Sequence, residues 1–169
     1  MEFHSDHGEK PLEREEKAAE LLHEAYRTQM KGDIGNAVRL CQASLHLHPT
    51  AEAHTFLGWA YSFLHRYEEA INECKSAIAL DPDLGNPYND VGLYLMKLGK
   101  LEEALPWLEQ AITAKRYEAR HYPHLNLGRL YLAKGDQLAA MREFSRAVEI
   151  APCYVPARFA LAALASQLN

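Results

Sequence analysis

The chain has 169 residues, 48% of them hydrophobic, and a formal net charge of -5 at pH 7. This length suits one folded unit, and the composition allows a core without indicating a membrane protein. The acidic excess offers no attraction to phosphate backbones, which argues against a nucleic-acid partner. No stretch approaches the roughly 20 consecutive apolar residues that span a bilayer, and the first residues are too charged for a signal peptide, so we expect a cytoplasmic protein without membrane insertion.

Residues 1–16 are mostly polar and charged, and we expect them to form an arm before the folded part. From residue 17 onwards, the chain repeats itself at intervals of 33, 34 and 36 residues. Two series of small residues mark this repeat: Ala25, Gly58, Gly92 and Gly128 in the first, and Ala37, Ala70, Ala104 and Ala140 in the second. Such self-similarity is the signature of a repeat architecture.

Each unit is predicted to be a helix, a tight turn and a second helix, because apolar residues recur at helical spacing on both sides of a turn. The small residues allow the two helices to approach closely. Three units close with a proline, which ends a helix, at Pro49, Pro82 and Pro152. The predicted units are residues 17–50, 51–84, 85–120 and 121–154, and residues 155–169 are predicted to form a closing helix that covers the last pair.

This order of large, small, aromatic and alanine positions before a proline resembles the tetratricopeptide repeat family. The second unit carries the resemblance best, with Leu57, Gly58, Tyr61, Tyr67, Ala70, Ala77 and Pro82. The third unit departs from it, because Arg116 stands in place of the proline and two extra residues precede Gly128. The resemblance implies an all-α, right-handed solenoid whose first helices line a concave groove.

The groove implied by the resemblance is the expected binding surface for a peptide or protein segment. Its candidate residues are Tyr26, Phe56, Trp59, Phe63, Asn89, Leu93, Asn126 and Arg129. Asn126 is similar in position to asparagines that hold peptides in some family members, although Asp90 takes the equivalent place one unit earlier. Phe56, Trp59 and Phe63 share one helix face, which either packs on a neighbouring element or forms a pocket for a partner.

No nucleophile motif, phosphate-binding glycine loop or dinucleotide fingerprint occurs, so we expect no enzyme activity and no cofactor. The histidines form no cluster with metal-ligand spacing, and the three cysteines suit reduced thiols, so no metal site is expected. The sequence therefore favours a protein-interaction adaptor or scaffold. Two alternatives stay open: a self-assembling scaffold and a small secretion-type chaperone for an apolar client.

Overall fold

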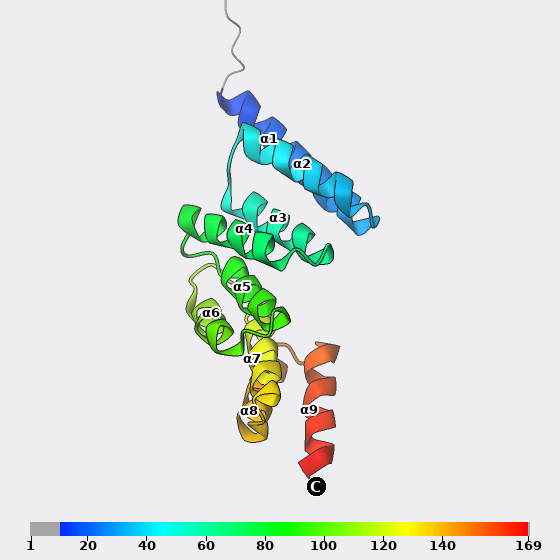
Figure 1. Cartoon of the computed structure of the whole chain (residues 1–169), viewed down its shortest axis with the longest axis vertical. Helices are drawn as coiled ribbons and strands as arrows, with labels where there is room; N and C mark the ends of the chain where they lie inside the picture. The colour runs from blue at the N-terminus through cyan, green and yellow to red at the C-terminus, as the bar shows by residue number, and fades with distance from the viewer. Residues whose placement is uncertain (1–10, 169) are drawn as a thin grey trace, which may run out of the picture.

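The computed structural model describes residues 11–168, which form nine helices. The helix pairs follow one another along the long axis of the molecule, and the last helix lies beside the final pair (Figure 1). The helices are α1 (Pro11–Met30), α2 (Ile34–Leu47), α3 (Ala51–Phe63), α4 (Tyr67–Leu80), α5 (Asn86–Lys97), α6 (Leu101–Thr113), α7 (His121–Ala133), α8 (Gln137–Ile150) and α9 (Val155–Leu168). Three helices begin at a side chain that accepts a backbone hydrogen bond from the first turn, namely Asp33, Thr50 and Asp136.

The helices form four pairs, in which α1 packs on α2, α3 on α4, α5 on α6 and α7 on α8. Each second helix also contacts the first helix of the next pair, and the first helices contact one another, so α1, α3, α5 and α7 form one layer of the stack. Helix α9 packs against α8 at the end (Figure 1). The expected all-α solenoid of four helix pairs and a closing helix is therefore confirmed.

The N-terminal boundary differs from the expectation. Helix α1 begins at Pro11, so residues 11–16, which were expected to belong to a polar arm, are helical. Proline suits the first turn of a helix because the amide hydrogen that it lacks has no partner there. The rest of the expected arm, residues 1–10, lies outside the described residues.

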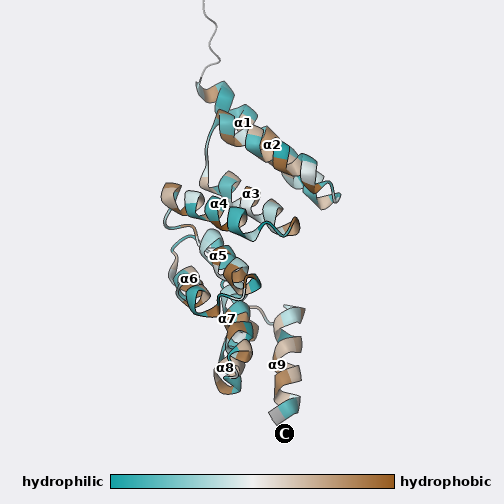
Figure 2. Cartoon of the chain, in the orientation of Figure 1, coloured by the Kyte–Doolittle hydropathy of each residue, from teal (hydrophilic) through white to brown (hydrophobic). Residues whose placement is uncertain are grey.

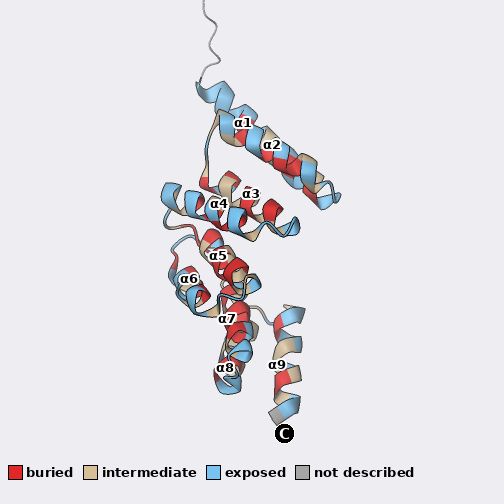
Figure 3. Cartoon of the chain, viewed as in Figure 1, coloured by how far each residue is buried: buried red, intermediate tan, exposed pale blue. Residues whose placement is uncertain are grey.

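The small residues of the repeat lie where the two helices of a pair meet. A Cβ atom built on Gly128 would lie 2.3 Å from the Phe144 ring, and one on Gly92 would lie 2.6 Å from Leu108. The alanines of the second helices are fully buried, and the buried residues follow the facing sides of the helices (Figure 3). In the second, third and fourth pairs, the close approach of the two helices therefore requires glycine at this position.

Two pairs share a polar contact that the sequence did not predict. The Nδ1 atom of His54 in α3 lies 2.6 Å from Oε2 of Glu73 in α4, and Nδ1 of His124 in α7 lies 2.8 Å from Oε2 of Glu143 in α8. These are the same positions of the second and fourth repeats. The histidines therefore join the first and second helices of these two pairs.

The segment after α6, residues 114–120, is called the strap here. It is the loop that the sequence predicts to be longer than its counterparts, and it runs back along the start of α5. The Arg116 amide donates to the Asp83 carbonyl at 2.9 Å, and the Gly85 amide donates to the Arg116 carbonyl at 3.1 Å. Tyr117 is buried against Gly85, where an added Cβ would lie 2.4 Å from the Cβ of Tyr117.

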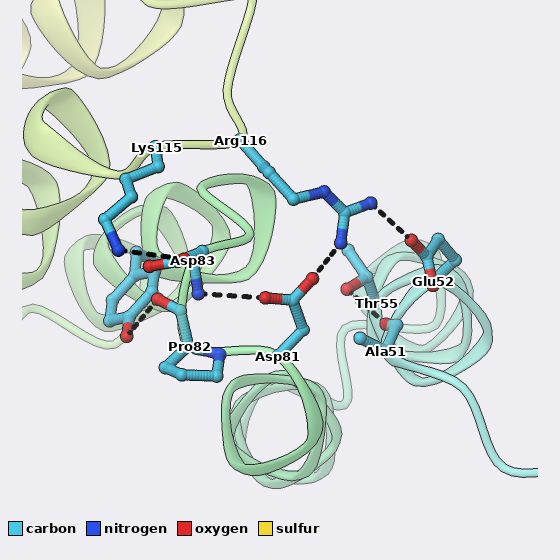
Figure 4. A network of polar contacts seen from close by, with 9 residues as sticks. Ala51, Glu52, Thr55, Asp81, Pro82, Asp83, Lys115 and Arg116 are labelled. Atoms are coloured by element: carbon cyan, nitrogen blue, oxygen red, sulfur yellow. Dashed lines mark hydrogen bonds and ion pairs between the residues drawn. The ribbon is translucent and has the colours of Figure 1, made fainter.

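Charged side chains of the strap reach the second repeat (Figure 4). Arg116 forms ion pairs with Asp81 at the end of α4 and with Glu52 in α3, the latter at 3.0 Å. Lys115 pairs with Asp83 at 3.1 Å. The strap thus joins the end of the third repeat to both helices of the second.

Candidate functional site

A groove of about 1000 Å³ runs along the layer of first helices. Residues from α1, α3, α5 and α7 line it, together with residues of the strap and of the linker before α9. All eight candidate residues predicted from the sequence are among them: Tyr26, Phe56, Trp59, Phe63, Asn89, Leu93, Asn126 and Arg129. The fold therefore brings them to one surface, and their use in binding stays a prediction.

Four of these side chains form an aromatic cluster, made of Tyr26, Phe56, Trp59 and Phe63. The Trp59 ring centroid lies 5.6 Å from that of Phe56 and 5.3 Å from that of Phe63, both with edge-to-face geometry. Tyr26 of α1 approaches Phe56 and Trp59 at 6.0 and 6.3 Å. Phe63 remains 51% exposed and Tyr26 50% exposed.

This cluster combines the two interpretations that the sequence left open. Phe56 packs against the core of the repeats and beside the neighbouring first helix α1. Trp59 and Phe63 meanwhile face the groove, with part of their surface accessible. The face is therefore partly packing surface and partly an apolar wall of the groove.

A row of hydrogen-bonded polar side chains crosses the groove from α7 to α5. Arg129 donates to the Oδ1 atom of Asn126 at 3.4 Å, Asn126 donates to Oδ1 of Asn89 at 3.0 Å, and Asn89 donates to Oδ1 of Asp90 at 3.2 Å. Asn89 and Asn126 are buried, with 7% and 4% of their surface exposed. We call these four residues the polar row.

The acidic end of the polar row is electrostatically unusual. Asp90 is half-buried in the wall of the groove, and burial raises the pKa of its carboxyl to about 7 because the charged form loses hydration, while the hydrogen bond from Asn89 opposes this shift. Its negative charge also contributes to raising the pKa of Tyr94 and of Tyr117, for both of which burial is the larger cause.

Sequence reasoning missed the aromatic groups that the loops contribute. Tyr154, in the linker before α9, packs against Tyr122 and His121 of α7, with ring centroids 5.4 and 4.7 Å apart. Tyr117 of the strap also lines the groove. The spacing of the repeat indicates neither Tyr117 nor Tyr154, since both lie outside the helices of the regular repeat.

Between residues 11 and 168, no group of three or more His, Cys, Asp or Glu side chains could hold a metal ion. Burial raises the pKa of the Cys41 thiol to about 12, and that of Cys74 well above its usual value, so both thiols stay protonated. None of the helices described is both long and apolar enough to cross a bilayer.

Stacked helix pairs around a concave groove define the class of helical-repeat solenoids. Two models of the tetratricopeptide repeat match the chain, over residues 51–84 and 90–153, and together they span more than half of it. The chain therefore belongs to the tetratricopeptide repeat family. Repeats of this family mediate protein–protein interactions.

Relatives of known sequence share only part of their length with this chain. Human DnaJ homolog subfamily C member 7 is 36% identical over 101 residues, which are 59% of this chain and 20% of that protein. Human protein O-mannosyl-transferase TMTC2 is 35% identical over 100 residues, which are 57% of this chain and 12% of that protein. The chain thus spans about a fifth or less of these relatives.

Solved structures agree in fold. Pseudomonas aeruginosa PilF superposes with a TM-score of 0.84 at 21% identity, covering 91% of this chain and 70% of that one. MamA gives a TM-score of 0.70 at 21% identity, covering 88% and 81%. YrrB, described as a TPR protein with an unusual peptide-binding site, gives 0.66 at 21% identity, covering 92% and 80%. At this identity the likeness shows the fold alone.

Proposed function

We propose that this chain is a non-catalytic adaptor that binds a peptide or an extended protein segment in its groove. The observation that carries the proposal is the juxtaposition of the aromatic cluster and the polar row along one groove of about 1000 Å³. Aromatic side chains in concave sites supply apolar contact area at a small cost in conformational entropy, and amide and guanidinium groups suit peptide backbones and carboxylates. A peptide-binding site in the structural neighbour YrrB gives the proposal further support.

The chain offers a matched pair of tryptophans for the test. Trp59 lines the groove, whereas Trp107 lies on the second helix α6, away from it, beside Tyr88. The experiment pans the wild-type protein against a phage-displayed library of random linear peptides and then measures binding of the enriched peptides to Trp59→Ala and Trp107→Ala. We expect Trp59→Ala to lose binding and Trp107→Ala to keep it, with circular dichroism showing that both variants stay helical.

The groove assignment is wrong if Trp59→Ala binds the enriched peptides as tightly as the wild type. A second variant, Phe63→Ser, guards against a folding artefact. Phe63 is 51% exposed, so its loss removes groove surface at little cost to the core. Undiminished binding by both variants would place the peptide site elsewhere.

Self-assembly is the second candidate, and α9 is the feature that favours it. Val155 and Phe159 are 67% and 74% exposed, and the helix is mostly apolar (Figure 2). Exposed apolar surface of this kind often marks an interaction site. We expect the molar mass in solution to rise with concentration for the wild type and to stay at the monomer value for Phe159→Glu; a constant wild-type mass would rule the candidate out.

A further inference from the structure

The hydrogen bonds of the polar row all run from donor to acceptor in one direction, from Arg129 towards Asp90. The residues at the two ends fix this direction. A guanidinium can only donate, so Arg129 requires an acceptor on Asn126, whose amide must then donate onward. An ionised carboxylate can only accept, so Asp90 requires the donor of Asn89. Each amide therefore has one orientation that satisfies the row. Asp90 is the terminal acceptor, and its second oxygen has no donor among residues 11–168.

Asp90 also differs from Glu52, which is another acidic residue that lines the groove. Glu52 forms an ion pair with Arg116. Within the described part of the chain, Asp90 has no Lys, Arg or His partner; its hydrogen-bond donor is the neutral amide of Asn89. A carboxylate that is half-buried without a counter-charge is costly, and a cation placed beside it reduces that cost.

An apolar position lies next to this carboxylate. Leu93 follows Asp90 by three residues on α5, so both side chains project from the same face of the helix. Leu93 lines the groove together with Trp59 and Phe63. One short segment in the groove can therefore meet an acidic group and an apolar wall.

We propose that the segment bound by this groove carries a lysine or arginine side chain that pairs with Asp90, beside an apolar side chain that packs on Leu93 and the aromatic cluster. This inference rests on the proposed function and adds the chemistry of the ligand. Arg129, at the opposite end of the polar row, repels a second cation and so favours a segment with its basic residue at the Asp90 end.

The test uses the enriched peptides of the phage library and two isosteric variants. Asp90→Asn removes the charge but keeps an oxygen that accepts from Asn89, and asparagine already occupies the equivalent place of the next repeat at Asn126. Glu109→Gln is the matched control, since it removes one carboxylate from an exposed position of α6. Binding of each peptide, and of its version with glutamine in place of the basic residue, is measured by fluorescence anisotropy on the wild type and both variants.

We expect the enriched peptides to share a basic residue near an apolar one. Replacing that basic residue should weaken binding to the wild type and to Glu109→Gln by about tenfold, while Asp90→Asn should bind both peptide versions within about twofold of one another. Enriched peptides without a shared basic residue, or a basic preference that survives in Asp90→Asn, would overturn the inference. If binding of those peptides is still lost in Trp59→Ala, the proposed function stands. If it is not lost, the assignment of the groove as the peptide site is wrong.

Discussion

The Nδ2 atom of Asn126 donates a 3.0 Å hydrogen bond to Oδ1 of Asn89, across the contact between α7 and α5. Both side chains are buried, so this bond joins the third and fourth repeats and also shapes the floor of the groove. Two residues that the sequence predicts as contacts for a partner are thus contacts for one another. Truncating either residue would therefore alter the packing of α5 and α7 as well as the surface of the groove.

The first prediction concerns that hydrogen bond. Asn126→Ala leaves the buried Oδ1 of Asn89 without its donor, and we expect the free energy of unfolding to fall by about 1–3 kcal/mol. Asn72→Ala, at an exposed position of α4, should change it little and serves as the control. Urea unfolding followed by circular dichroism measures both. Equal stability of Asn126→Ala and the wild type would mean that the bond contributes nothing to the stack.

The second prediction compares one chemical change at two glycines. Gly128→Ala would place a Cβ 2.3 Å from the Phe144 ring, and we expect it to destabilise the protein by about 1–3 kcal/mol. Nothing lies within 4 Å of a Cβ on Gly35, in the first turn of α2, so Gly35→Ala should be neutral or stabilising by up to about 1 kcal/mol. Thermal unfolding of the two variants gives the comparison. Loss of stability in Gly35→Ala alone would contradict the packing described for the repeat.

The third prediction separates the contacts that hold the strap. Tyr117 is buried, and Tyr117→Ala should lower the free energy of unfolding by about 3 kcal/mol through the cavity that it leaves. The ion pairs of Arg116 are exposed and screened by salt, so Arg116→Gln should cause a small loss that disappears at high ionic strength. The free energy of unfolding, measured at low and at high salt for both variants, distinguishes the buried contact from the ion pairs. A larger loss for Arg116→Gln than for Tyr117→Ala would show that charge holds the strap.

The fourth prediction concerns pH. The carboxyl of Asp90 has an ordinary pKa of 3.8 in the unfolded chain and about 7 in the fold, so between these values the folded state binds a proton that the unfolded state has released. This residue's contribution to stability therefore falls as pH rises from about 4 to above 7. The Asp90→Asn variant has no carboxyl group at this position that could bind or release a proton. Its stability relative to the wild type should increase by about 1–3 kcal/mol between about pH 5 and about pH 8.

Urea unfolding at several pH values checks this difference, and Glu109→Gln, which lacks an exposed carboxylate, is the control. The control should follow the wild type across the range. Parallel pH profiles for Asp90→Asn and the wild type would show that the Asp90 carboxyl titrates as an ordinary acid, fully ionised in the fold.

The sequence predicts the architecture well because the repeat is local. The spacing of Gly58, Gly92 and Gly128 reports a contact between helices that are neighbours in the chain, and one short motif defines each pair. The groove candidates follow from the same count, since first helices present equivalent faces in every unit. The start of α1 at Pro11 was missed because residues 11–16 show no apolar periodicity; they are all exposed and extend the helix beyond its first buried residue, Ala18.

Other parts of the site depend on contacts between residues far apart in sequence. The hydrogen bond between Asn126 and Asn89 spans 37 residues, and the ion pair of Arg116 with Glu52 spans 64. Neither pair shares a motif, so no periodicity indicates them. Tyr154 and Tyr117 reach the groove from irregular segments, whose course is set by tertiary packing instead of by helical periodicity.

The strap joins neighbouring repeats by contacts outside the regular packing of helices. In a solenoid, each repeat normally contacts only its neighbours, through one interface between helix pairs. The strap adds ion pairs between the second and third repeats, in which Arg116 reaches Glu52 and Asp81, and Lys115 reaches Asp83. Because Phe56, Trp59 and Phe63 lie on α3 and Asp90 lies on α5, the strap joins the two repeats that carry these two parts of the groove.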